Sequence, residues 1–298
     1  MRVCTACGSI HCDDAWVCEE CGNKPAVIAG FNAFAPLLAM ENAGFREEYF
    51  AALAELEAGN FWFRARNELI VWAMRTYVPG CRTFLEVGCG TGFVLKGIHA
   101  AFPTIALSGS EIFSVGLDFA ANRVPSAAFY QMDARRIPFR DEFDAIGAFD
   151  VLEHIDEDEA VIAEAHRALL PRGVFLATVP QHMSLWSQQD VAAYHVRRYA
   201  ASELRRKITA AGFEIVRMVS FVSLLLPMMF ASRLRMRDEK PASEFDALDA
   251  LRLPRPINAA LETVMTVERT LIRRGIAFPA GGSLLVVARK REEAGNAA

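Results

Sequence analysis

Short apolar runs alternate with longer amphipathic runs from residue 81 onward. The short runs predict β-strands at residues 83–87, 106–111, 128–132, 144–149, 173–179, 214–220 and 283–288. The longer runs predict helices at residues 93–102, 114–122, 157–169 and 201–211. Strands that alternate with helices are typical of a mostly parallel sheet covered on both faces. We therefore expect an α/β domain over residues 81–298.

Three further segments differ from this pattern. Residues 1–25 are rich in Cys and Gly, whereas residues 31–80 predict a helical segment with helices at 45–57 and 60–77. Residues 221–282 form a long insertion before the last strand. Its first part is apolar, its middle is rich in charge and proline, and residues 257–274 have helical spacing. Insertions of this length often form a lid or a partner surface.

Composition limits the function classes. The chain has 298 residues, 53% of them hydrophobic, and a net charge of −4, which disfavours a phosphate-coated partner such as nucleic acid. The start of the chain lacks the apolar stretch of a signal peptide, and residues 221–230 are too short to span a membrane. We expect a cytoplasmic protein. Arg233, Arg235 and Arg237 beside that apolar run favour contact with a membrane surface, while a buried lid or dimer helix is the alternative.

Five of the seven cysteines lie in the first 21 residues. Cys4, Cys7, Cys18 and Cys21 form two CxxC pairs, each followed by Gly, and four thiolates at this spacing satisfy a tetrahedral zinc ion. We predict a structural zinc ribbon, with His11 and Cys12 as bystanders. Basic residues are few in this arm, so protein contact or packing within the chain is favoured over nucleic-acid binding.

The strongest chemical signal follows the strand at 83–87. Gly88, Gly90 and Gly92 form a glycine-rich turn into a helix, where a ligand can approach the backbone closely. Glu111 falls at the end of the next strand, the place of an acid that accepts hydrogen bonds from ribose hydroxyls. Glu86 precedes the first glycine, and its carboxylate would repel a pyrophosphate but suit a ligand with an ammonium group. A tight turn without a ligand is the alternative.

These residues resemble motif I of class I S-adenosylmethionine (SAM)-dependent methyltransferases, and four later segments agree in order and spacing. The segments are Gln131-Met132-Asp133-Ala134, the run from Phe143 to Ile155, Leu169-Leu170-Pro171-Arg172-Gly173 and Ala211-Gly212-Phe213-Glu214. The resemblance covers about residues 60–220 and 283–290 and is nearest to the ubiquinone and menaquinone methyltransferase branch. It implies a Rossmann-like seven-stranded sheet with an antiparallel last strand and helices on both faces.

The resemblance also implies a cofactor site. Glu111 would hold the ribose, Asp133 the adenine amine with the Ala134 amide, and Phe149 with Asp150 would line the methionine side. Trp62 and Arg66 lie in a helix that resembles one that closes over SAM, although a packed helix with a surface charge explains them equally. The complete set expected at the cofactor is Glu86, Gly88, Cys89, Gly90, Gly92, Glu111, Ile112, Asp133, Ala134, Phe149, Trp62 and Arg66.

Three histidines are candidates for catalysis at the acceptor. His154 follows the fourth strand, near the expected position of the transferred methyl, and can act as a base or as a structural residue before the next helix. His182 and His195 follow the fifth strand on the same side as the cofactor. Arg197 and Arg198 either hold an anionic acceptor or begin the next helix.

The sequence therefore predicts methyl transfer from SAM to a small or lipid-like acceptor, with O-methylation favoured. Two other classes stay open: a SAM-binding interaction protein without catalysis, and an RNA methyltransferase. The latter is disfavoured because Asp150-Val151-Leu152-Glu153 stands where an amine-binding Asn-Pro-Pro-Tyr-type motif would be expected.

Overall fold

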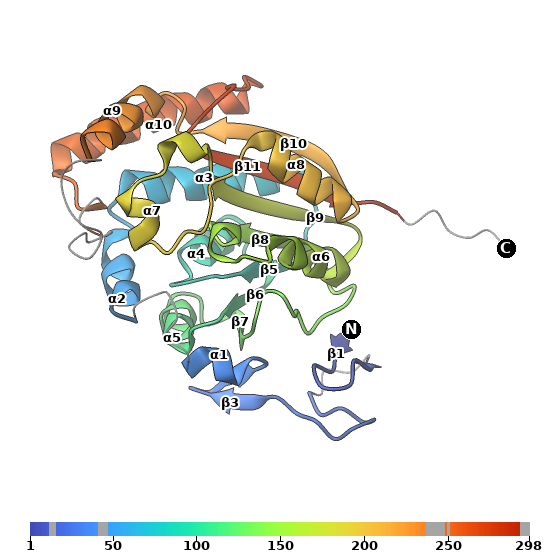
Figure 1. The fold of residues 1–298 in the computed structure, drawn as a ribbon. Helices are drawn as coiled ribbons and strands as arrows, with labels where there is room; N and C mark the ends of the chain where they lie inside the picture. The colour runs from blue at the N-terminus through green and yellow to red at the C-terminus, as the bar shows by residue number, and fades with distance from the viewer. Residues whose placement is uncertain (12–15, 41–46, 237–247, 249–250, 293–298) are drawn as a thin grey trace.

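A computed structural model describes residues 1–11, 16–40, 47–236, 248 and 251–292. Its centre is a nine-stranded sheet with the strand order β10-β11-β9-β8-β5-β6-β7-β4-β3 (Figure 1). The strands are β3 (Ala26–Ile28), β4 (Phe31–Ala33), β5 (Thr83–Val87), β6 (Ala106–Glu111), β7 (Ala128–Gln131), β8 (Phe143–Phe149), β9 (Leu169–Pro180), β10 (Phe213–Phe221) and β11 (Ser283–Lys290). The six neighbouring strands β9, β8, β5, β6, β7 and β4 pair in parallel. Strand β11 runs antiparallel to both β9 and β10.

Helices connect most of the strands. They are α1 (Pro36–Met40), α2 (Glu47–Leu56), α3 (Phe61–Tyr77), α4 (Phe93–Ala101), α5 (Ser114–Arg123), α6 (Asp158–Ala168), α7 (Gln188–Ala192), α8 (Ala201–Ala210), α9 (Leu226–Met236) and α10 (Arg255–Arg273). Each strand that precedes a crossover helix ends at the same edge of the sheet, as parallel βαβ units require. Loops that follow these strands are therefore brought together.

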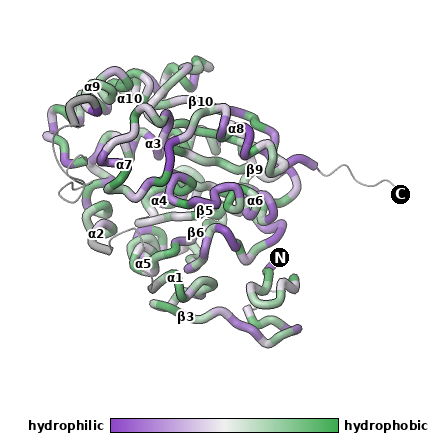
Figure 2. The backbone as a smooth tube through the Cα atoms, in the orientation of Figure 1, coloured by the Kyte–Doolittle hydropathy of each residue, from purple (hydrophilic) through white to green (hydrophobic). Residues whose placement is uncertain are grey.

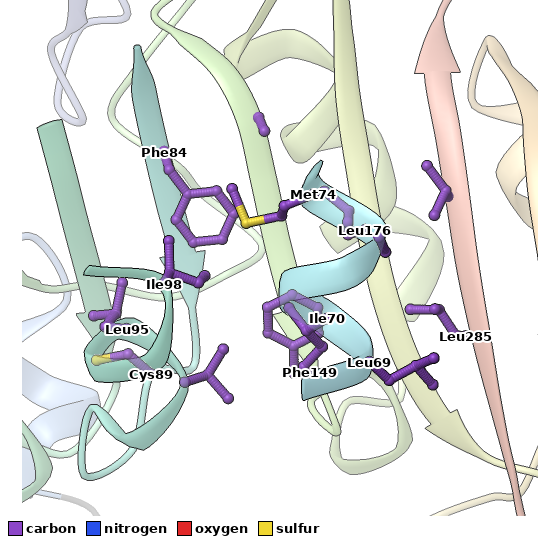
Figure 3. Close-up of a cluster of buried hydrophobic side chains, with 14 of the residues drawn as sticks. Leu69, Ile70, Met74, Phe84, Cys89, Leu95, Ile98, Phe149, Leu176 and Leu285 are labelled. Atoms are coloured by element: carbon purple, nitrogen blue, oxygen red, sulfur yellow. The ribbon is translucent and has the colours of Figure 1, made fainter. Parts of the chain in front are cut away.

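Two hydrophobic cores cover the two faces of the sheet. Successive strand residues point to opposite faces, so Phe84 packs with α3, α4 and α5, and its neighbour Leu85 packs with α6 and α8. Figure 3 shows the first core, where one face of α3 lies against the sheet. The labelled side chains there are Leu69, Ile70, Met74, Phe84, Cys89, Leu95, Ile98, Phe149, Leu176 and Leu285. Burial on both faces explains the nearly continuous apolar runs of these strands.

The expected α/β sheet with an antiparallel last strand is confirmed, with all seven predicted strands present. The expectation of seven strands is too low, because β3 and β4 extend the sheet beyond β7. These strands are three residues long and lie partly in the segment 31–80, which we expected to be helical. Their short runs carry no clear alternation, and pairing with the exposed edge of β7 stabilises them. The division of the chain into three domains stays a prediction.

The insertion packs through α10 against α3. Asn258 in α10 accepts a hydrogen bond from the Phe61 amide at 2.8 Å, and Arg64 forms an ion pair with Glu262 at 2.9 Å. The predicted helix at 257–274 corresponds to α10, and apolar and hydrophilic residues mix along it and along α9 (Figure 2).

Arg237 lies outside the described residues, as does the side chain of Arg235. Within the described ranges, no helix is long and apolar enough to span a membrane. Peripheral contact of residues 221–282 with a membrane or a protein, and oligomer formation, stay predictions.

A buried carboxylate fixes the insertion to the end of β10. The Glu268 side chain, fully buried on α10, accepts hydrogen bonds from the amides of Val222, Ser223 and Leu224 at 2.6, 2.7 and 2.7 Å. These amides lie where the chain leaves β10, so they lack strand partners and need this acceptor.

We expect Glu268→Ala to lower the free energy of unfolding by about 3 kcal/mol, because three buried amides lose a charged acceptor. Urea-induced unfolding measures this change. Glu159→Ala is the control, since Glu159 and its partner Arg206 are both well exposed and such pairs contribute below about 1 kcal/mol. Equal effects of the two substitutions would contradict the role of Glu268.

Candidate functional site

A cavity of about 740 Å³ lies at the edge where the parallel strands end. Its wall contains residues that follow β5, β6, β7 and β8, together with side chains of α2 and α3. Ligands of open α/β sheets bind at this edge. The volume is in the range of small-molecule and cofactor sites.

The glycine-rich turn forms the floor of this cavity, and its backbone explains the need for glycine. Gly88, Gly90 and Gly92 all have positive φ angles, of 68°, 51° and 76°. A Cβ atom on Gly92 would lie 2.8 Å from the Cα of Ala120 in α5, so the turn also packs against its neighbour helix. Cys89 is buried, and its amide donates to the Ser110 carbonyl at 2.8 Å. Gly88, Cys89 and Gly90 line the cavity, whereas Gly92 lies behind it at the start of α4.

Glu111 lies at the end of β6 and faces the turn. Its carboxylate accepts hydrogen bonds from the amides of Gly90 at 3.0 Å and Ile112 at 2.8 Å. Burial raises the pKa of Glu111, and these backbone amides oppose the rise by stabilising the charged form. The carboxylate is thus held beside the cavity, where it can accept further hydrogen bonds from a ligand.

Glu86 is a second acid in the wall, and it is 2% exposed. Its Oε2 atom has no hydrogen-bond partner among the described residues. Burial raises the pKa of Glu86 well above its usual range, and the charge of Arg66 acts in the opposite direction. A buried carboxylate oxygen without a partner favours a donor or a cation in the adjacent space.

Helix α3 contributes a cation, Arg66, to the cavity wall. Arg66 forms an ion pair with Asp150 and lies over the Trp62 ring, with 4.6 Å between its Cζ atom and the ring centroid. Burial lowers the pKa of Arg66, whereas Glu86 and Glu57 raise it. Trp62 and Arg66 therefore both line the cavity, and Asn60 fixes the start of their helix by accepting from the Trp62 amide.

A network that the sequence analysis missed joins α2 to the turn. The Glu57 carboxylate accepts from the Thr91 hydroxyl at 2.7 Å and from Arg123 at 2.6 Å, and Arg123 also donates to the Ala54 carbonyl at 2.8 Å. Glu57 and Thr91 are buried and line the cavity. These residues are far apart in sequence, and the Thr within the turn was the one signal that could have suggested a partner.

The loop after β7 brings Asp133 and Ala134 to the cavity, and β8 brings Phe149. Asp133 forms an ion pair with Arg135 at 2.9 Å, and Arg135 also pairs with Glu157 at 2.9 Å. Twelve residues were expected at a cofactor. All of them except Gly92 line this one cavity, and Ile112 is among them.

The three candidate histidines are not equivalent. His154 lines the cavity, and the surrounding protein together with the His195 ring lowers the pKa of His154 to about 4. His195 packs behind His154, with 4.8 Å between the ring centroids, and its Nδ1 atom lies 3.0 Å from Asp190. His182 is absent from the described cavity wall, and burial lowers its pKa.

Two arginines of the same loop are already paired. Arg198 donates to Asp190 at 2.6 Å, and Arg197 pairs with Asp158 at 2.9 Å. The Tyr199 hydroxyl also donates to Asp158 at 2.6 Å. Arg197 and Tyr199 attach the loop to α6, and Arg198 attaches it to α7, so the two arginines do not act as free anion ligands.

The four cysteines of the N-terminal arm converge. The Sγ atoms of Cys4 and Cys21 lie 3.7 Å apart, and those of Cys7 and Cys18 lie 3.6 Å apart. All four lie within 4.8 Å of one another. Sulfurs bound to one tetrahedral zinc ion at about 2.3 Å are roughly 3.8 Å apart, so the thiols fit this metal.

Comparison with known proteins shows that this chain is similar to methyltransferases. A sequence profile described as "Methyltransferase domain" matches residues 85–177. Residues 85–177 therefore belong to a methyltransferase domain. A probable S-adenosylmethionine-dependent methyltransferase of Mycolicibacterium smegmatis is 29% identical over 164 residues, which cover 52% of this chain and 60% of that protein. A ubiquinone biosynthesis O-methyltransferase of Idiomarina loihiensis is 26% identical, over 44% of this chain and 60% of that protein.

A solved structure shares the fold of this methyltransferase domain. It is phosphoethanolamine N-methyltransferase 2 of Haemonchus contortus in complex with S-adenosyl-L-methionine, with a TM-score of 0.57 and 17% identity. The similarity covers 85% of this chain and 59% of that chain. The chain thus spans about 60% of the length of the curated relatives that it matches, and the resemblance inferred from motif I is confirmed.

We expect Gly92→Ala to destabilise the methyltransferase domain by about 3 kcal/mol, since it adds a left-handed backbone cost to a clash with Ala120. Gly90→Ala is the matched control. It has the same backbone cost, about 1 kcal/mol, but nothing lies within 4 Å of its added Cβ. Thermal and urea-induced unfolding compare the two variants, and equal stability would contradict the packing role of Gly92.

Proposed function

We propose that this chain transfers the methyl group of SAM to a small-molecule acceptor, preferably at an oxygen atom. One observation carries the proposal: two carboxylates, of the buried Glu86 and the half-buried Glu111, flank a glycine-rich turn at the wall of one cavity. The Glu86 carboxylate, directly before the turn, would repel a pyrophosphate. SAM instead offers an ammonium group and a sulfonium, which the acids stabilise, and ribose hydroxyls, which donate to a carboxylate.

Each part of SAM has a matching group in the wall. Glu111 would accept from the ribose hydroxyls, and Asp133 from the adenine amine beside the Ala134 amide. Glu86 would face the ammonium group, and Arg66 would pair with the carboxylate of the methionine part. Gly88, Cys89, Gly90, Ile112, Phe149 and Trp62 supply the remaining wall.

The acceptor would enter on the side of His154. Bound SAM supplies an electrophilic methyl group, so this chain has to hold an acceptor in line with it. His154 is the candidate histidine that lines the cavity and would contact the acceptor, with His195 packed behind it. An oxygen acceptor is supported by the Idiomarina loihiensis relative, whose name gives an O-methyltransferase. His182 does not line the described cavity, so we assign it no part in this step.

We also propose a structural zinc ion held by Cys4, Cys7, Cys18 and Cys21. Two backbone turns support the fit: the Gly8 amide donates to the Cys4 carbonyl at 2.9 Å, and the Gly22 amide donates to the Cys18 carbonyl at 2.8 Å. Four thiolates leave no position open for a substrate, so the role is structural. The arm also packs on the domain, since the Val3 amide donates to the Pro138 carbonyl at 3.0 Å.

We expect Glu111→Ala to weaken SAM binding on the order of 100-fold, because two hydrogen bonds from the ribose to a charged acceptor are lost. Isothermal titration calorimetry measures the affinity, and circular dichroism checks the fold. Asp118→Ala removes an exposed acid from α5 and is the control, with unchanged affinity expected. Equal affinity of Glu111→Ala and the control would remove the ribose assignment.

We expect cobalt(II) bound by the cysteines to give a thiolate charge-transfer absorption that is lost in Cys7→Ser and Cys21→Ser, because each substitution removes one sulfur ligand. Cys81→Ser is the control. Burial raises the pKa of Cys81 to about 12, and Cys81 is no part of the four-cysteine cluster. An absorption that survives in Cys7→Ser would rule out this ligand set.

A further inference from the structure

Three side chains with metal-binding atoms meet at the wall and directly behind it, beside the proposed acceptor position. They are Glu153 and His154, from the turn after β8, and His195, from the loop after α7. One ligand atom of each lies within 4.8 Å of the others. His154 lines the cavity, and so do Tyr194 and Val196 on either side of His195.

Glu153 is buried without a partner. The residue is fully buried, and neither carboxylate oxygen has a hydrogen-bond partner among the described residues. The nearby cations are paired elsewhere, Arg66 with Asp150 and Arg198 with Asp190. A buried carboxylate left without a donor costs free energy that a bound cation would remove.

His195 is oriented toward Glu153 by a second carboxylate. Its Nδ1 atom lies 3.0 Å from Asp190, and its Nε2 atom lies 4.0 Å from the Glu153 carboxylate. Asp190 is itself buried and accepts from the Ser187 amide at 2.9 Å and from Arg198 at 2.6 Å. A carboxylate that holds one imidazole nitrogen while the other faces a ligand position is the usual arrangement at metal-bound histidines.

We propose that Glu153, His154 and His195 bind a divalent transition-metal ion next to the methyl-donor site. Two imidazoles and one carboxylate suit such an ion and leave coordination positions open. Donor atoms bound to one ion at about 2.1 Å lie roughly 3–4 Å apart. Binding therefore requires a small inward movement, which the exposed His154 side chain at the cavity can supply.

The open positions would take a hydroxyl oxygen of the acceptor, and this extension rests on the proposed function. The metal-bound hydroxyl would release its proton to water, because a divalent ion lowers the pKa of a bound oxygen. That oxygen would then form a bond to the methyl carbon of SAM. The carbon–sulfur bond breaks with its electron pair on sulfur, which gives the methyl ether and S-adenosylhomocysteine. The metal thus selects acceptors with a hydroxyl group.

Titration of the full chain with manganese(II), without SAM, tests the site. Manganese prefers oxygen and nitrogen ligands to thiolates, so the four cysteines contribute little to its binding. The electron paramagnetic resonance signal of free manganese measures the bound fraction. We expect one manganese ion per chain, and at least a 100-fold loss of affinity in Glu153→Gln and in His195→Asn. Asp190→Asn, which alters a positioning residue, should weaken binding about 10- to 100-fold.

His99→Asn is the matched control, because it removes a histidine of α4 outside the cluster and should keep wild-type affinity. Circular dichroism of the metal-free variants checks that each one folds. No manganese binding by the wild type, or equal binding by Glu153→Gln and the control, would overturn the site. Either result leaves SAM binding to Glu111 untouched, and failure of SAM binding leaves the manganese titration interpretable.

Discussion

The constraint that shapes this molecule is an excess of buried and half-buried carboxylates at one edge of a parallel sheet. Glu57, Glu86, Glu111 and Asp150 all line the cavity, and Glu153 lies directly behind its wall. The cations that meet them are already engaged with carboxylates: Arg66 with Asp150 and Arg123 with Glu57. Burial raises the pKa of Glu86 and Glu111, and it raises the pKa of Glu153 to about 8. The charged forms therefore need positive charge from outside the chain, which a sulfonium ligand with an ammonium group supplies.

The parts of the fold around this edge serve to hold the acids in place. The backbone amides of Gly90 and Ile112 fix Glu111, while Thr91 and Arg123 fix Glu57. Helix α3 brings Arg66 across the cavity, and α10 supports α3 through Glu262 and Asn258. Residues 251–273 of the insertion thus have a role in shaping the site, although they follow the glycine-rich turn by more than 150 positions.

Local signals explain how much could be predicted from the sequence. The strands, the turn at Gly88 to Gly92 and Glu111 follow from periodicity and spacing within some 30 residues, and the structure places them together. The pairing of β4 with β7 joins residues far apart in the sequence and involves only a short segment, so no periodicity in the sequence predicts it. The Glu57–Thr91–Arg123 network and the contact of Asp190 with His195 depend on side-chain packing in the folded state. An isolated acid or histidine in a sequence does not reveal such partners.

Calorimetric titration of the intact protein with S-adenosylhomocysteine, and separately with NAD⁺, tests the central claim most directly. The two acids beside the glycine-rich turn should admit the adenosyl ligand, and Glu86 should repel the pyrophosphate. We expect one S-adenosylhomocysteine per chain and no heat from NAD⁺. Uptake of NAD⁺ with no uptake of S-adenosylhomocysteine or SAM would contradict the claim.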